Sequence, residues 1–96
     1  LVAGNITING AGNFATIQDA VNNASDGDTI EVGEGIYNEN VVVNNKQNIV
    51  IQGTNAVLMP SNGIGFVITD SDGITIKRFQ INTTGLNSHG IWIGGA

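Results

Sequence analysis

The side chains that could do chemistry in this sequence are few. His89 is the single histidine, and it lies in Asn87-Ser88-His89-Gly90, where a turn histidine ahead of a strand is the simplest interpretation. Glycoside hydrolysis needs two carboxylates about 5–10 Å apart across the scissile bond. Asp70 and Asp72 are close enough in sequence, but Asp-Ser-Asp-Gly is ordinary turn chemistry. The sequence therefore offers no convincing acid and base for a hydrolase.

An elimination reaction on an acidic polysaccharide would need a basic side chain beside carboxylates that hold calcium. Lys77 and Arg78 are adjacent, so in a regular strand their side chains point to opposite faces. One of them would then lie near the core, unless the pair forms a bulge or a corner. We therefore expect no catalytic residues and no enzymatic activity in this chain.

Two pairs of aspartates are weak candidates for calcium binding. Asp26 with Asp28, and Asp70 with Asp72, place hard oxygen ligands close together, which suits calcium. Neither pair completes a calcium loop such as the EF-hand pattern. With one histidine and no cysteine, no transition-metal site is expected. No cofactor is predicted.

Composition excludes several classes of partner. The 96 residues include three Lys and Arg against eight Asp and Glu, which gives a formal charge of −5. Binding to the phosphate backbone of a nucleic acid requires a basic patch, which this chain cannot build. No apolar run approaches the roughly 20 residues of a membrane-spanning helix, so membrane insertion is not expected either. The length suits a single small domain, 1–96.

Short β-rich triplets recur at a spacing of about 25 residues. The first set is Val41-Val42-Val43, Phe66-Val67-Ile68 and Ile91-Trp92-Ile93. The second is Ile49-Val50-Ile51 and Ile74-Thr75-Ile76, and a looser third is Ile30-Glu31-Val32, Val57-Leu58-Met59 and Phe79-Gln80-Ile81. Segments rich in Gly, Asn and Asp separate the triplets and predict turns. Three short strands per repeat predict an all-β fold, a parallel β-helix with one coil per repeat.

The N-terminal segment has a different periodicity. One helix face is formed by five apolar residues, Phe14, Ile17, Ala20, Val21 and Ala24. Thr16 followed by Asp19 resembles a capping box, so we expect a helix at about 16–24. The helix would cover the first coil, because an uncovered end exposes strand edges. Residues 1–29 are thus predicted to be an N-terminal strand and capping helix, and residues 30–96 the coils.

Four segments carry a family resemblance: FATIQDAV at 14–21, DGDTI at 26–30, GIYNENV at 35–41 and IVIQG at 49–53. In this order they resemble the N-terminal cap and first coils of the pectate-lyase-like right-handed parallel β-helix superfamily. The closest similarity is to the parallel β-helix repeat proteins of bacterial envelopes and archaeal cell surfaces. The resemblance covers essentially residues 5–93. It implies the fold but no single function, because lyases, hydrolases, adhesins and structural surface proteins share this opening.

The first set of triplets predicts an interface. If Val41 and Val43 face the core, then Val42, Val67 and Trp92 form an apolar row on the outside. Such a row should not remain in water. Another part of the chain could cover it, a partner protein could bind it with Trp92 as anchor, or it could serve as an aromatic platform for carbohydrate. Together with Ile91 and Ile93, the row is the predicted interface.

The two ends of the chain add an expectation about assembly. The sequence begins with Leu1 and ends with Gly94-Gly95-Ala96, without a visible capping element. We expect a mature product or a fragment whose C-terminal end contacts further coils of a longer chain or another subunit. Head-to-tail contacts of this kind give filaments unless they close into a ring, and lateral contacts between copies are the other arrangement.

The predicted function is therefore structural or adhesive. We expect a secreted or cell-surface protein that is a subunit of a surface layer, sheath or filament, or the capped start of a larger surface protein. The alternatives are the N-terminal fragment of a polysaccharide lyase or glycoside hydrolase, and a carbohydrate-binding module whose partner is a polysaccharide. Three N-glycosylation sequons, at Asn5, Asn23 and Asn82, would be occupied only on an archaeal or eukaryotic surface.

Overall fold

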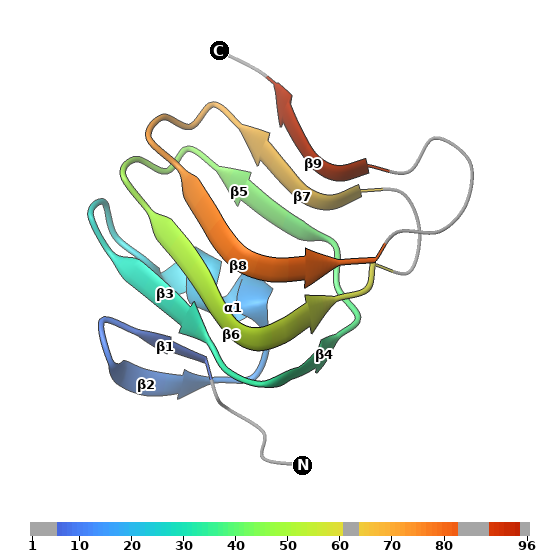
Figure 1. The fold of residues 1–96 in the computed structure, drawn as a ribbon. Coiled ribbons are helices and arrows are strands. Elements are labelled where there is room, and N and C mark those ends of the chain that lie inside the picture. Colours follow the sequence, from blue (N-terminus) through green and yellow to red (C-terminus); the bar gives the residue numbers. More distant parts are fainter. Residues whose placement is uncertain (1–5, 61–63, 83–88, 95–96) are drawn as a thin grey trace.

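Two β-sheets face each other, and one helix lies at one end of them (Figure 1). This is a computed structural model, and it describes residues 6–60, 64–82 and 89–94. The mixed sheet consists of β1 (Ile6–Ile8), β2 (Ala11–Phe14), β3 (Thr29–Val32), β4 (Gly35–Tyr37), β6 (Val50–Leu58) and β8 (Thr75–Ile81). The parallel sheet consists of β5 (Val41–Asn44), β7 (Ile64–Thr69) and β9 (His89–Gly94), in that order. The helix is α1 (Ile17–Asn23).

The 25-residue spacing of the triplets corresponds to parallel strand pairing. In the parallel sheet, Val41 of β5 is paired with Phe66 of β7, which is paired with Ile91 of β9. In the mixed sheet, Ile51 of β6 is paired with Ile76 of β8. Equal spacing therefore brings like residues side by side on neighbouring strands.

The predicted right-handed parallel β-helix with three strands per coil is nevertheless wrong. The described strands form two sheets, of which one is mixed, and they do not close into a solenoid. The second and third sets of triplets are not separate strands, because β6 runs through both of them, bending at Gly53, Thr54 and Asn55. The first strand also departs from the prediction, since β1 pairs antiparallel with both β2 and β3. The result is a small compact domain.

The core lies between the two sheets and beneath α1. Its largest fully buried side chain is Phe66, whose ring meets that of Phe79 edge to face at 5.5 Å between centroids. Leu58 is also fully buried, although regular alternation of Ile30-Glu31-Val32 and Val57-Leu58-Met59 would place the middle residue of each triplet outside. The bend in β6 changes the inward and outward pattern, so the residues beyond the bend alternate in a different phase from the expected one.

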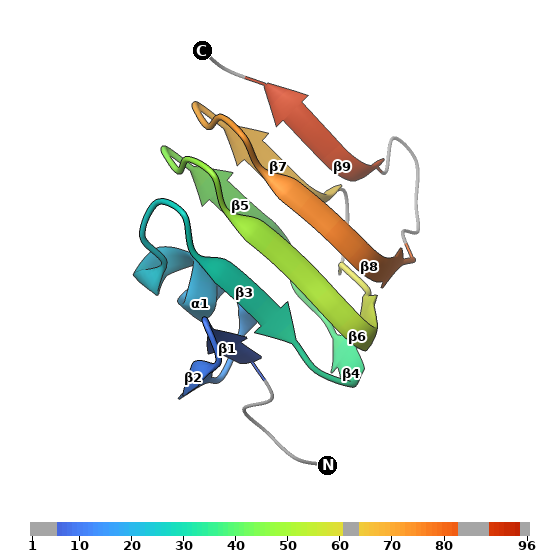
Figure 2. The same cartoon turned by 60° about the vertical axis from the view of Figure 1, so that its left-hand side comes forward.

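Helix α1 forms close to the predicted segment. The Thr16 side chain accepts a hydrogen bond from the backbone N–H of Asp19 at 3.0 Å and caps the first turn. Ile17, Ala20 and Val21 are buried against the sheets. Figure 2 shows α1 at the end of the molecule opposite β9. This helix is not long or apolar enough to cross a membrane, and the described part of the chain contains no other that is.

Candidate functional site

The end of the molecule formed by β8 and β9 is uncovered among the described residues and exposes apolar side chains on β9; we refer to it as the open end. On β9, Ile91 and Trp92 are each 43% exposed and Ile93 is 72% exposed. Behind them a layer of partly buried side chains packs on the core: Ile74, Ile76, Phe79 and Ile81. No described strand pairs with the outer edge of β9. The backbone groups along this edge are therefore available to a further strand.

The structure brings the five predicted interface residues together. Val42 of β5 is paired with Val67 of β7, and Val67 is paired with Trp92 of β9. Val42 is exposed, Val67 is half-buried, and the Trp92 ring lies over Gly94, where a Cβ atom would collide with it. Ile91 and Ile93 continue the rows of buried residues that begin at β5, but they are exposed because β9 is the last strand of its sheet.

At the other edge of the parallel sheet, a side chain replaces a neighbouring strand. The Gln18 amide accepts a hydrogen bond from the backbone N–H of Val42 at 2.7 Å and donates one to the Val42 carbonyl at 2.9 Å. These are the two bonds that an adjacent strand would make to the same residue. The β5 edge is thus occupied at its centre, and the two edges of this sheet differ in kind.

Two further residues bind α1 at the end of the molecule formed by α1 and β5, which we refer to as the closed end. The Glu39 carboxylate accepts hydrogen bonds from the first two helical N–H groups, those of Ile17 at 2.8 Å and Gln18 at 3.1 Å. A carboxylate is well placed there, because the helix N-terminus carries unpaired donors and a partial positive charge. At the C-terminus of the helix, the Lys46 ammonium donates to the carbonyl of Ala24 at 2.8 Å. The helix is therefore held at both ends by residues from later in the chain.

Replacing Gln18 with alanine should weaken the closed end. Two hydrogen bonds to Val42 are lost, so we expect a decrease of about 1–2 kcal/mol in the free energy of unfolding, since water replaces them only in part. Hydrogen exchange of the Val42 amide should accelerate, because its N–H loses the Gln18 partner. Asn22→Ala is the control, because Asn22 accepts only an exposed bond from the same Gln18 side chain. Equal exchange rates of the Val42 amide in the two variants would contradict the assigned role of Gln18.

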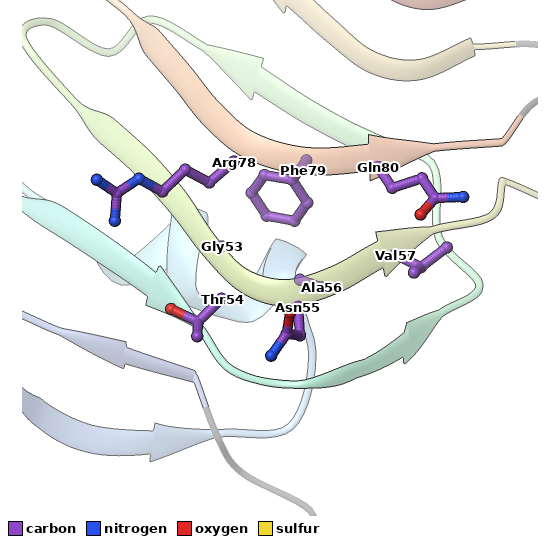
Figure 3. Close-up of a pocket in the computed structure, with 8 residues that line it drawn as sticks. All are labelled: Gly53, Thr54, Asn55, Ala56, Val57, Arg78, Phe79 and Gln80. Atoms are coloured by element: carbon purple, nitrogen blue, oxygen red, sulfur yellow. The ribbon is translucent and has the colours of Figure 1, made fainter.

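A second candidate site is an open groove of about 670 Å³ along the bend of β6 and β8 (Figure 3). It is lined by Gly53, Thr54, Asn55, Ala56, Val57, Arg78, Phe79 and Gln80. In Figure 3 the side chains of Arg78 and Gln80 extend to opposite sides of the Phe79 ring. The groove therefore combines an aromatic ring with amide, hydroxyl and guanidinium groups.

Arg78 has an unusual backbone conformation. Its φ is +63°, whereas the other described non-glycine residues with positive φ are Asn or Asp, for which this region is common. Lys77 and Arg78 are both exposed as a result, so neither lies near the core. The pair therefore forms an irregularity of the kind that the sequence allowed as the alternative to a regular strand. The Arg78 side chain is exposed and has no hydrogen bond or ion pair to any other described residue.

The aspartates considered for calcium take part in turns. The Asp28 carboxylate accepts hydrogen bonds from the Ser25 backbone N–H at 2.8 Å and from the Asn9 amide at 2.9 Å, and these bonds lower the pKa of Asp28. Asp26 accepts a long bond from the backbone N–H of Gln47 at 3.3 Å. Asp70, with a positive φ of 48°, and Asp72, which forms a β-bridge with Gln47, flank Ser71 between β7 and β8. Among the described residues, no three Asp, Glu or His side chains are grouped to hold a metal ion.

Two of the remaining predicted residues, Asn23 and Asn82, lie on the surface. Asn23 is exposed at the end of α1, where its amide donates to the carbonyl of Asp19 at 2.8 Å. Asn82 is exposed just after β8. Asn5 lies outside the described residues, and His89 is described only as the first residue of β9. The two described sequon residues, Asn23 at the end of α1 and Asn82 after β8, therefore lie on different elements.

Tyr37 gives a spectroscopic measure of packing near Glu39. Its hydroxyl donates to the carbonyl of Gly33 at 2.8 Å, and burial, with a smaller effect of the Glu39 carboxylate, raises the pKa of Tyr37. Because Tyr37 is the single tyrosine, phenolate absorbance should appear at higher pH in the folded than in the denatured chain. The unfolded state then loses its proton first, so stability should be unaffected by Tyr37 below about pH 10 and decrease above it. Tyr37→Phe should remove this decrease, and identical titrations of folded and denatured chain would refute the assignment.

The residues that matter most at the closed end were not identified from the sequence. Gln18 and Glu39 lie within two of the segments that carry the resemblance, but no local pattern assigns them a role, because each acts on a partner more than 20 residues away. The resemblance to the pectate-lyase-like superfamily stays a prediction from sequence motifs. No protein-family model matches the chain, and neither a curated protein nor a solved structure matches it.

Proposed function

We propose that this chain is a non-catalytic structural or adhesive module that associates through its open end, in a secreted or cell-surface assembly. The observation that carries the proposal is the exposure of Ile91, Trp92 and Ile93 on a strand whose outer edge has no described partner. Adjacent exposed apolar side chains with free backbone donors and acceptors are typical of a surface that is covered in the working state.

The contrast between the two edge strands supports this assignment. β8 carries Lys77 and Arg78, and the backbone of Arg78 interrupts its regular strand geometry. Charged side chains and bulges are the devices that protect an edge from unwanted pairing. β9 carries Ile91, Trp92 and Ile93 in place of such charges. The edge that lacks protection is therefore the better candidate for a specific contact.

The proposal is tested by the mass of the purified chain in solution, measured together with electron microscopy. Oligomers or ordered assemblies that dissociate in a Trp92→Ala variant would support association through the open end. A Trp92→Ala variant that stays folded and assembles as well as the parent chain would refute it. Circular dichroism of both chains provides the folding control.

The groove on β6 and β8 supports a second candidate, a carbohydrate-binding module. Arg78, Gln80 and Asn55 present charged and amide groups around Phe79, a combination suited to the hydroxyl and acidic groups of a sugar. In this case Arg78→Ala should abolish binding to an acidic polysaccharide, while Trp92→Ala leaves it unchanged. Binding that depends on Trp92 and not on Arg78 would instead place the binding site at the outer row of Val42, Val67 and Trp92.

A further inference from the structure

We propose that β9 of one copy pairs antiparallel with β9 of a second copy, about a twofold axis at Trp92, and that association stops at this dimer. The inference rests on the proposed function, because it names the partner of the same open end. It is carried by the sequence of the edge strand, the occupied opposite edge and the distribution of charge.

The exposed part of β9 is complementary to its own reversed copy. In an antiparallel pair centred on Trp92, Ile91 of each copy lies opposite Ile93 of the other, and the two Trp92 side chains lie opposite each other. Because neighbouring residues alternate between faces, both isoleucine pairs share one face and the tryptophans share the other. Apolar side chains placed directly opposite each other are the pairs that stabilise a sheet. A shift of the pairing register by one residue would place Trp92 opposite an isoleucine, so that the isoleucine pairs and the tryptophan pair would both be lost.

The closed end makes a head-to-tail stack through this sheet unfavourable. Such a stack would join the β9 edge of one copy to the β5 edge of the next. At β5, however, the Gln18 amide already occupies both backbone groups of Val42. One free edge remains in this sheet, and a twofold pair uses it in both copies. A closed dimer is therefore expected in place of a filament.

The distribution of charge also favours contact through β9. Of the eight acidic residues, six precede β5 in the sequence, and the other two, Asp70 and Asp72, lie between β7 and β8. β9 contains no Asp, Glu, Lys or Arg. Two copies of a chain with a formal charge of −5 would thus pair through an uncharged strand, while β8 at the same end carries the positive charges of Lys77 and Arg78. Because the remaining repulsion is between like charges, added salt should strengthen the dimer.

The available area fits a dimer of moderate affinity. Strands about 20 Å long in two sheets about 10 Å apart give an end face of roughly 500 Å² in each copy, with side chains included. Two copies would bury roughly 1,000 Å², which is near the lower limit for a specific interface. We therefore expect dissociation constants in the micromolar range.

The first test measures dimer formation by sedimentation equilibrium from about 1 to 100 µM, the range in which a micromolar complex dissociates. Trp92 is the only tryptophan, so its emission should shift to shorter wavelength as the dimer forms. Ile93→Lys, which adds a charge to the edge, should weaken dimerisation at least tenfold. The matched control is Ile36→Lys, because Ile36 is 64% exposed on β4 of the other sheet and should leave dimerisation unchanged.

The second test examines the register by disulfide formation, since the chain has no cysteine. A mixture of Ile91→Cys and Ile93→Cys chains should cross-link, whereas each variant alone should not, because its own cysteines would be too far apart. Cross-linking within either single variant would overturn the register.

A monomer at every concentration would overturn self-pairing but leave association with a different partner intact. Filaments would overturn the closed dimer, and association insensitive to Ile93→Lys would overturn both this inference and the proposed function.

Discussion

Phe66→Ala is expected to lower the free energy of unfolding by about 3–5 kcal/mol. Phe66 is fully buried between the two sheets, and its ring packs edge to face with the ring of Phe79, at 5.5 Å between centroids. Truncation removes this contact and leaves a cavity that the surrounding strands can fill only in part. Since domains of this size are stable by only about 5–15 kcal/mol, the variant should unfold at much lower urea concentration.

The matched control is Val67→Ala, one residue further along β7. Val67 points to the outer face and is half-buried, so its truncation should cost no more than about 1 kcal/mol. Both variants are compared with the parent chain by circular dichroism at one protein concentration, because dimer formation would itself stabilise the fold. Equal losses in the two variants would mean that β7 does not present Phe66 to the core as described.

Much of the strand pairing could be predicted, and the reason is physical. A buried column needs apolar residues from each strand, so Val41, Phe66 and Ile91 recur at the spacing that pairs them. The bend in β6 was hidden because Gly53-Thr54-Asn55 has the composition of a turn between strands. In the structure Asn55 takes a positive φ of 54°, and the strand continues to pair with β8 on both sides of it.

The direction of β1 was missed for a different reason. Asn9 and Gly10 have φ values of 52° and 81°, the two positive values of a tight hairpin turn. An Asn-Gly pair is a strong local signal for such a turn. The 25-residue periodicity favoured a parallel first coil over this signal, and the local turn chemistry determined the outcome: β1 and β2 are antiparallel.

The candidate site was predictable only where alternation along a strand determines exposure. Val42, Val67 and Trp92 could be placed on one outer row because alternation within paired strands is regular. The groove at Arg78 could not be found in this way, since a positive φ in an arginine has no signature in the sequence. The asymmetry between the open and closed ends was equally hidden, because it depends on a side-chain amide that takes the place of a strand.

Glu39→Ala should have the second largest effect on stability. The Glu39 carboxylate accepts from the backbone N–H groups of Ile17 and Gln18, and hydrogen bonds to a charged group contribute about 1.5–3 kcal/mol each. Because both bonds meet at one half-buried side chain, we expect a combined loss of about 2–4 kcal/mol in the free energy of unfolding. The measurement is urea unfolding followed by circular dichroism.

The effect of Glu39→Ala should extend beyond stability to assembly. Gln18 lies in the first turn of the helix that Glu39 caps, so loosening this turn should also release the Gln18 amide from Val42 and free the β5 edge. We then expect oligomers larger than those of the parent chain, because both edges of the parallel sheet can accept a strand. Glu34→Ala is the control, since Glu34 is an exposed glutamate whose loss should change stability by less than about 0.5 kcal/mol. If Glu39→Ala were destabilised without any change in oligomer size, the closed end would be a folding device alone and would not limit assembly.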